Sequence, residues 1–408
     1  MTRHVHLPIP EELRGAIAAA GERALEHELS REVPEAEIRA LAAAGIGLLR
    51  LPEEHGGFGH TWREQTEVLL ELATQDSNIP QALRVHIAIQ EEALWRGAKS
   101  DVSRAWLARL AAGDLVGNAW TEPGKGGYDG FQTRLTETPD GPRVTGEKAY
   151  TTGSLVADWL DVTARDEGGR ELGLIVRRDQ PGVSVRDDWP GFGQKTTASG
   201  GASLENAIVD AYEVRLLDDR YPYQAAVFQQ VLLIVLAGIV AAAARQAGEE
   251  LRNRKRAYTH GNTARAGDDP QLLQAIGEVD ATAALARAQV LETATALDEA
   301  FATRGSAREE QREAAREADL ATARAQVALR GPVLGAVSRL FDALGASAPD
   351  EAKGLDRYWR NARTVLSHNP WVYKARIVGD WLVNGTGPVG LWGVGIPEDA
   401  KTAAQPVG

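Results

Sequence analysis

Apolar residues recur every three or four positions over both ends of the chain, and this spacing predicts helices there. Before residue 114, the expected helices are Glu11 to Glu28, Glu35 to Ala44, Trp62 to Gln75 and Ser77 to Trp95. After residue 220, apolar positions define two long helices with small residues on one face, Ile276 to Phe301 and Arg308 to a kink at Gly331-Pro332. Such faces favour tight antiparallel packing in a bundle.

The middle of the chain has a different pattern. Short runs rich in β-branched and aromatic residues predict strands at Phe131 to Glu137, Arg143 to Thr151, Trp159 to Ala164 and Glu171 to Arg177. Asp140-Gly141 and Gly168-Gly169 are typical of hairpin turns. We therefore predict an α+β protein with an N-terminal helical domain at 1–113, a central β domain at 114–220 and a C-terminal helical bundle at 221–408.

The net charge and the hydropathy of the chain limit the kinds of molecule that the protein is expected to bind. The 408 residues include 45 basic and 57 acidic side chains, for a net charge of -12, so the basic surface of a nucleic-acid binder is not expected. Met1 to Pro10 does not resemble a signal peptide, and the longest apolar run, Val231 to Ala244, is too short to span a membrane. We expect a cytoplasmic protein in which this run is a buried helix.

Sulfur is almost absent from the chain, which has no cysteine and Met1 as its one methionine. Disulfides, thiolate metal sites and thiol nucleophiles are thereby excluded, and no histidine spacing is typical of a zinc site. Three explanations remain open: compositional drift, protection of an oxygen-activating enzyme from self-oxidation, and economy during sulfur starvation.

The C-terminal stretch from Tyr358 to Tyr373 carries the strongest candidate chemistry. Arg360 and Arg363 have helical spacing and lead into His368, after which Asn369-Pro370 ends the helix. A histidine at an exposed helix end can transfer protons near neutral pH. Taken alone, the stretch is equally typical of a solvated helix face with a capping histidine.

Four segments together resemble the acyl-CoA dehydrogenase superfamily, and specifically its flavin-dependent monooxygenase branch, similar to dibenzothiophene monooxygenase and the sulfone-utilisation oxidoreductases. They are Gly117 to Gly124, Glu147 to Ser154, Asp187 to Gly200 and Arg360 to Pro370. In the dehydrogenases a catalytic glutamate follows the arginine-rich helix, whereas Asn369 stands at about that place here. An amide cannot remove an α-proton. The monooxygenase branch has a His-Asp-Pro turn there, from which this chain departs by the same Asn369.

The resemblance implies a fold with an N-terminal helical domain, a central β-barrel-like domain and a C-terminal four-helix bundle. It also implies a two-component enzyme that receives reduced FMN from a separate NAD(P)H-dependent flavin reductase, with FAD the less favoured cofactor. Oxygen would be transferred through a C4a-hydroperoxyflavin, and the expected substrate is a small organosulfur compound such as a sulfone or sulfide. The family's assembly implies a homotetramer, a dimer of dimers.

The resemblance also implies site residues. His368, Thr152 and His86 are the expected catalytic residues, and no metal site is expected. The expected cofactor-binding residues are Asn118, Trp120, Thr121, Thr152, Trp189, Thr197, Ser199, Arg254 and Arg256. Arg254 and Arg256 are expected to reach the flavin phosphate of a neighbouring subunit.

Other functions stay open on the sequence. An FAD-dependent acyl-CoA dehydrogenase would need a base in place of Asn369, for which Glu249 or Glu250 is a candidate. A monooxygenase of the same branch could instead act on aromatic carbon or amine nitrogen. A catalytically silent homologue acting as a binding subunit would fail to bind FMN.

Overall fold

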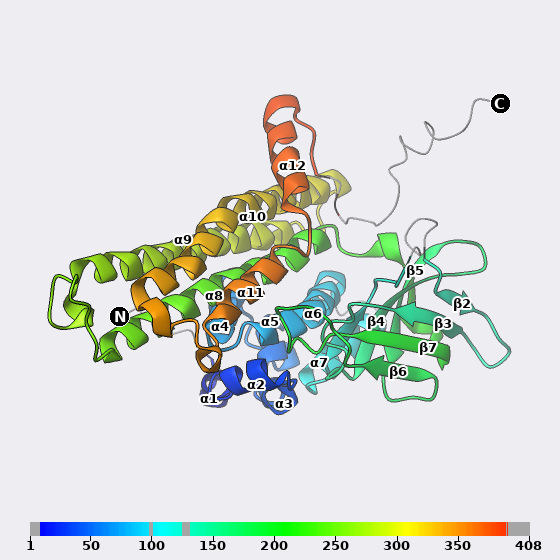
Figure 1. Cartoon of the computed structure of the whole chain (residues 1–408). Coiled ribbons are helices and arrows are strands. Elements are labelled where there is room, and N and C mark those ends of the chain that lie inside the picture. Colours follow the sequence, from blue (N-terminus) through cyan, green and yellow to red (C-terminus); the bar gives the residue numbers. More distant parts are fainter. Residues whose placement is uncertain (1–8, 98–100, 125–130, 389, 391–408) are drawn as a thin grey trace, which may run out of the picture.

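The computed structural model describes residues 9–97, 101–124, 131–388 and 390, and it shows helices, then a sheet, then a helical bundle along the chain (Figure 1). The sheet lies at one end of the molecule and the long helices at the other, with the N-terminal helices beside the junction. The predicted α+β class is confirmed by this arrangement.

The N-terminal helices are α1 (Glu11–Ala20), α2 (Ala24–Ser30), α3 (Glu35–Ala43), α4 (Trp62–Gln75), α5 (Asn78–Ala82), α6 (Arg84–Arg96) and α7 (Asp101–Ala111). α4 begins where the sequence predicts, because Thr61 and Glu64 form a capping box. Two predicted helices are each divided. The first breaks at Gly21, where a Cβ would lie 2.5 Å from the Gln75 side chain of α4, and the second breaks at Leu83.

The described strands form one mixed sheet in the order β6-β7-β3-β2-β4-β5-β8, with β1 paired to β4. Their bounds are β1 (Val116–Ala119), β2 (Arg134–Thr136), β3 (Arg143–Lys148), β4 (Trp159–Arg165), β5 (Glu171–Arg177), β6 (Val183–Arg186), β7 (Gly201–Ile208) and β8 (Val214–Leu216). β1 runs parallel to β4, with Asn118 opposite Asp161. The sequence does not predict β7, because only Ile208 in that strand is β-branched.

The C-terminal helices are α8 (Gln224–Asn253), α9 (Pro270–Ala302), α10 (Arg308–Leu344), α11 (Asp356–Val365) and α12 (Trp371–Asn384). α10 continues through Pro332, so the proline does not end the helix. Among the described residues, α8 is the one helix long and apolar enough to cross a membrane, but 89% of its apolar window is buried in the protein. Its burial matches the predicted role of Val231 to Ala244 as a core helix.

A buried carboxylate joins the N-terminal helices to the bundle. Glu91 of α6 accepts hydrogen bonds from Arg50 Nε at 2.9 Å, from Trp62 Nε1 at 2.9 Å and from the Tyr223 hydroxyl. Arg50 also lies 3.5 Å from Asp298 of α9. The charge of Glu91 is therefore balanced by Arg50 inside the core, and its position fixes α6 against α4 and α8.

We expect Glu91→Gln to destabilise the fold by about 3 kcal/mol or more, because Arg50 would lose its main counter-charge while remaining buried. Chemical denaturation followed by circular dichroism measures the change. Glu171→Gln is the matched control, since Glu171 is exposed and its partner Arg165 is only half-buried, and ion pairs open to solvent contribute roughly 0–1 kcal/mol. Equal losses in the two variants would contradict the central place given to Glu91.

Candidate functional site

α11 is fixed to the β domain by hydrogen bonds to the segment 187–200. The Asn361 side-chain oxygen accepts from the Gln194 backbone N–H at 2.6 Å, and Arg360 Nη1 donates to the Phe192 carbonyl at 2.8 Å. A Cβ on Gly193 would lie 2.2 Å from the Arg360 carbonyl oxygen, so glycine is required at that contact. His368 follows α11 by three residues, and its position relative to the sheet therefore depends on this contact.

Three predicted residues form a chain of buried hydroxyl groups. Thr197 Oγ1 lies 2.8 Å from Ser199 Oγ, which lies 2.9 Å from Thr152 Oγ1 and donates to it. Gln194 and Ala198 have φ values of 52° and 51°, a left-handed conformation that non-glycine residues seldom adopt and that often occurs at functional sites. Because Thr152 accepts from Ser199 and donates to no described protein group, its own hydrogen is free for a ligand.

Asn118 supports the turn that carries Thr152. Its backbone N–H donates to the Thr152 carbonyl at 2.9 Å, and its side-chain amide donates to the Tyr150 carbonyl at 3.0 Å. Gly117 lies against the same turn, since a Cβ there would be 2.6 Å from the Ser154 Cα. The structure therefore uses the Asn118 amide to position the turn.

The indole of Trp120 is held at the end of β1. Trp120 Nε1 donates to Asp161 at 2.8 Å, the Arg220 guanidinium lies 4.7 Å from its ring centre, and its ring meets Phe228 of α8 edge-on at 5.5 Å. The next residue, Thr121, accepts a hydrogen bond from the Ala149 N–H through its carbonyl at 2.8 Å.

Trp189 lies elsewhere on the β domain. Its Nε1 donates to the Gly193 carbonyl at 3.1 Å, and its ring meets Tyr150 edge-on at 5.8 Å. Tyr150 directly precedes Thr151-Thr152 in the chain. The structure therefore places Trp189 beside the turn that carries the hydroxyl chain.

Arg84, which the sequence reading missed, is the α6 residue that reaches His368. Arg84 Nη2 lies 3.2 Å from His368 Nε2, and the guanidinium lies 5.2 Å from the centre of the Phe228 ring. A signal was present in the sequence, because Arg84 interrupts an apolar run and no acidic residue stands three or four positions away on the helix. Arg84, Phe228 and Trp120 thus link His368 to the end of β1.

His86, one of the expected catalytic residues, makes no described hydrogen bond with His368. His86 is buried, neither ring nitrogen has a hydrogen-bond partner, and a Cβ on Gly47 would lie 2.8 Å from its Nε2. Residues two apart on a helix point in nearly opposite directions, and Arg84 is the one that faces His368. Burial lowers the pKa of His86 to about 4, so the ring is neutral.

Arg254 and Arg256 lie at the far end of α8 from Phe228. The 26 positions between Phe228 and Arg254 correspond to about 39 Å of helix. Arg254 donates to the carbonyls of Ala343 and Leu344, whereas Arg256 is exposed. Both line a separate cavity of about 210 Å³. Neither arginine can reach a ligand held beside Thr152 in the same chain.

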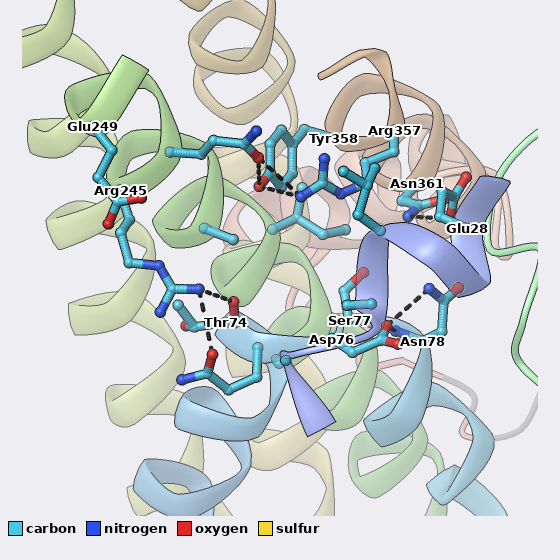
Figure 2. Close-up of a pocket in the computed structure, with 18 of the residues that line it drawn as sticks. Glu28, Thr74, Asp76, Ser77, Asn78, Arg245, Glu249, Arg357, Tyr358 and Asn361 are labelled. Carbon is cyan, nitrogen blue, oxygen red and sulfur yellow. Dashed lines mark hydrogen bonds between the residues drawn. The ribbon is translucent and has the colours of Figure 1, made fainter. Parts of the chain in front are cut away.

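A cavity of about 360 Å³ is also separate from His368 (Figure 2). Figure 2 shows Glu249 and Arg245 on one side of it and Asp76 and Asn78 on another. Its lining includes both glutamates considered as alternative bases, and none of the predicted site residues. Glu249 lies 21 positions beyond Phe228, about 32 Å along α8.

His368 keeps solvent-exposed surface, yet its pKa is low. Surrounding protein atoms and the Arg84 cation lower the pKa to about 3, while a side-chain hydrogen bond with Asn369 acts in the opposite direction. The imidazole is therefore neutral at pH 7. Because Nε2 accepts from Arg84, the ring proton resides on Nδ1. Without a ligand, the ring is therefore a neutral hydrogen-bonding group and not a charged acid. Arg84 is one cause of its low proton affinity.

Comparisons with known proteins extend over almost the whole chain. Three domain models match in order: acyl-CoA dehydrogenase N-terminal domain at residues 7–114, middle domain at 117–207 and C-terminal domain at 233–371. A probable FMNH2-dependent monooxygenase, SfnC of Pseudomonas putida, is 28% identical over 396 residues, 94% of this chain and 95% of the relative.

Two solved structures superpose closely. TdsC of Paenibacillus sp. A11-2, a dibenzothiophene monooxygenase solved with FMN and indole, gives a TM-score of 0.84 at 25% identity over 93% of this chain and 98% of that chain. The methanesulfinate monooxygenase MsuC of Pseudomonas fluorescens gives 0.83 at 27% identity, again over 93% and 98%.

We expect NMR of histidine-labelled protein to show His368 as the neutral Nδ1–H tautomer from pH 8 down to pH 5. In the unfolded chain the ring takes up a proton near pH 6.5, and the folded chain does not, so this residue contributes a loss of stability as pH falls below about 6.5. Arg84→Met should raise the pKa of His368, and Arg84→Lys should keep it low. A titration midpoint near 6.5 in the unmodified protein would contradict this assignment.

Proposed function

Because the chain belongs to the acyl-CoA dehydrogenase family, we propose that it is a flavin-dependent monooxygenase that uses reduced FMN and O2 on a small organosulfur compound. Relatives along nearly the full chain are named for reduced-FMN-dependent oxygenation, dibenzothiophene and methanesulfinate, and TdsC was solved with bound FMN. The observation that carries the proposal is the position of His368, which is followed by Asn369 in the turn after α11 and whose Nε2 lies 3.2 Å from Arg84 Nη2.

The residues where the β domain meets the helical bundle suit a bound FMN. The free hydrogen of Thr152 can meet a ring nitrogen of the flavin, and Ser199 and Thr197 extend the hydroxyl chain toward a polyhydroxyl tail. Trp120 offers an aromatic ring held in place by Asp161. When bound, reduced FMN would activate O2, giving one oxygen atom to the substrate and releasing the other as water. The resemblance implies that oxygen would be transferred through an adduct of the flavin, and we include that step in this proposal.

The protein's contribution is positioning, hydrogen bonding and exclusion of water. His368 would place its neutral ring beside the reacting oxygen. Its Nδ1–H would donate to that oxygen in place of Asn369, while Arg84 fixes the orientation of the ring at Nε2. Phe228 and Trp120 supply an apolar wall beside it. Thr152, in the turn that follows β3, would fix the edge of the cofactor from the side of the β domain.

The dehydrogenase alternative lacks a base in the required place. Asn369 carries no proton-accepting carboxylate, and Glu249 and Glu250 lie about 32 Å along α8 from Phe228, on a separate cavity. A general base must come within hydrogen-bond reach of the proton that it removes. The geometry therefore favours oxygen transfer over removal of an α-proton.

The partners follow from the same proposal. A separate NAD(P)H-dependent reductase would supply reduced FMN, and the enzyme would work in the cytoplasm as a homotetramer. The 39 Å separation along α8 supports assembly, because Arg254 and Arg256 can contact a flavin phosphate only when it is bound by another copy. Mass spectrometry of products formed from reduced FMN, O2 and a panel of sulfides, sulfones, sulfinates and aromatics tests the function as a whole.

We expect His368→Ala to uncouple flavin oxidation from oxygen transfer, because a positioned proton-handling group contributes about 100-fold or more. Product formed per reduced FMN consumed should fall at least about 10-fold while hydrogen peroxide rises. Stopped-flow absorbance with product quantification measures both. His55→Ala, in the segment between α3 and α4, is the control. An unchanged ratio in His368→Ala would remove His368 from the reaction.

We expect Arg256→Ala to weaken FMN binding about 10-fold, the loss typical of one charge-assisted hydrogen bond. Its thermal unfolding midpoint should not change, because Arg256 is exposed and makes no described contact within its own chain. Fluorescence quenching gives the Kd, and Arg312→Ala on the exposed face of α10 is the control. Unchanged FMN affinity in an oligomeric Arg256→Ala protein would exclude the proposed contact between copies.

A further inference from the structure

Arg84 is a buried cation without an acidic partner. It is 6% exposed, and no described carboxylate lies within 4 Å of its guanidinium. Two other buried arginines behave differently: Arg50 binds both oxygens of Glu91 at 2.9 and 3.3 Å, and Arg220 binds both oxygens of Asp161 at 2.7 and 3.0 Å. Burying a charge is unfavourable unless it is paired, so the exception at Arg84 requires a cause.

The neighbours of Arg84 do not satisfy its charge. Within the described part of the chain, its side chain makes one hydrogen bond, from Nη2 to the neutral His368 Nε2, and its buried Nε–H has no acceptor. The ring of Phe228 offers a cation–π contact, which compensates little of the lost hydration. Burial lowers the pKa of Arg84 to about 10, which still leaves the guanidinium charged at pH 7. An anion that the described residues do not supply would complete the pairing of Arg84.

We infer that Arg84 binds the negatively charged end of the substrate beside His368, and that the substrate is an anionic organosulfur compound, with an organosulfinate as the best fit. This inference rests on the proposed function. A guanidinium presents two parallel N–H groups that match two oxygens sharing one charge. A sulfinate has two such oxygens and keeps a lone pair on sulfur. Holding both oxygens leaves that lone pair free to accept the transferred atom.

The reaction balances with the reactants of the proposed function. A sulfinate, O2 and reduced FMN give a sulfonate, water and oxidised FMN. A sulfur–oxygen bond forms and the O–O bond breaks, while the two hydrogens and two electrons of reduced FMN leave with the second oxygen as water. The negative charge is retained in the product, so Arg84 can stay paired throughout.

A second source of anionic oxygen is the FMN phosphate, and the experiment separates the two. Benzenesulfinate and methyl phenyl sulfide are matched probes, because they share the aromatic ring and differ in charge. We expect benzenesulfinate to raise the thermal unfolding midpoint of the FMN-loaded unmodified protein and to have no such effect on Arg84→Leu. In turnover with reduced FMN, the selectivity for benzenesulfinate over the sulfide should fall about 10- to 100-fold in Arg84→Leu, and Arg84→Lys should recover part of it.

Stability provides a control for folding. Removing an unpaired buried cation should leave the unfolding midpoint of ligand-free Arg84→Leu unchanged or higher, whereas Arg50→Leu, which leaves Glu91 without its partner, should lower it. If Arg84→Leu instead weakens FMN binding and retains the sulfinate response, Arg84 serves the phosphate and the inference is overturned.

The remaining outcomes also decide the question. Absence of any sulfinate-induced shift in the unmodified protein, or an equal shift in Arg84→Leu, overturns the inference even if the sulfide is oxygenated and the proposed function stands. Oxidation of reduced FMN without product from any member of the substrate panel, despite a sulfinate-induced shift that depends on Arg84, would instead reject the proposed function and keep the anion site.

Discussion

The arrangement of the site depends on the hydrogen bond between the Asn361 side chain and the Gln194 backbone N–H. Both residues are buried, and they belong to different parts of the fold: α11 in the helical bundle, and the segment before β7 in the sheet. The hydroxyl chain begins within three residues of Gln194, and His368 follows within seven of Asn361. This one contact therefore fixes the distance between the group that can hold a cofactor and the group that can handle a proton. The glycine at position 193 is needed because the helix backbone approaches so closely.

Buried charges divide into two kinds in this protein. Arg50 with Glu91 and Arg220 with Asp161 are complete pairs that join elements, and the second pair also holds Trp120 through its Nε1. Such pairs serve the fold and give no chemistry. Arg84 and His368 form a pair without a negative charge, in which a cation lowers the proton affinity of its neighbour. The site therefore differs from the supporting structure in that its buried cation, Arg84, has no described carboxylate partner.

Much of the fold follows from periodicity, and part of the site does not. α4 and β5 have the predicted bounds, because a capping box and an apolar run that ends in Ile175 and Val176 act locally. His368, Thr152, Thr197 and Ser199 were recognised from motifs, and the structure joins the last three through hydrogen bonds. Arg84 was not predicted as a site residue, whereas His86, two positions further along α6, was. The choice between two residues on one helix depends on how α6 is rotated against α8 and α11, which is a tertiary property that a motif does not contain.

The same electrostatics connect substrate binding to proton transfer. In the ligand-free site, burial and, after it, the positive charge of Arg84 lower the pKa of His368, so the ring holds no extra proton at neutral pH. An anion bound to the guanidinium would offset that charge, and the proton affinity of the imidazole would rise toward its ordinary value. His368 would then become a useful proton carrier only when a charged substrate is present. A neutral substrate would leave Arg84 uncompensated and the imidazole weakly basic, so the proposed pair would discriminate between substrates in the proton transfer step as well as in binding.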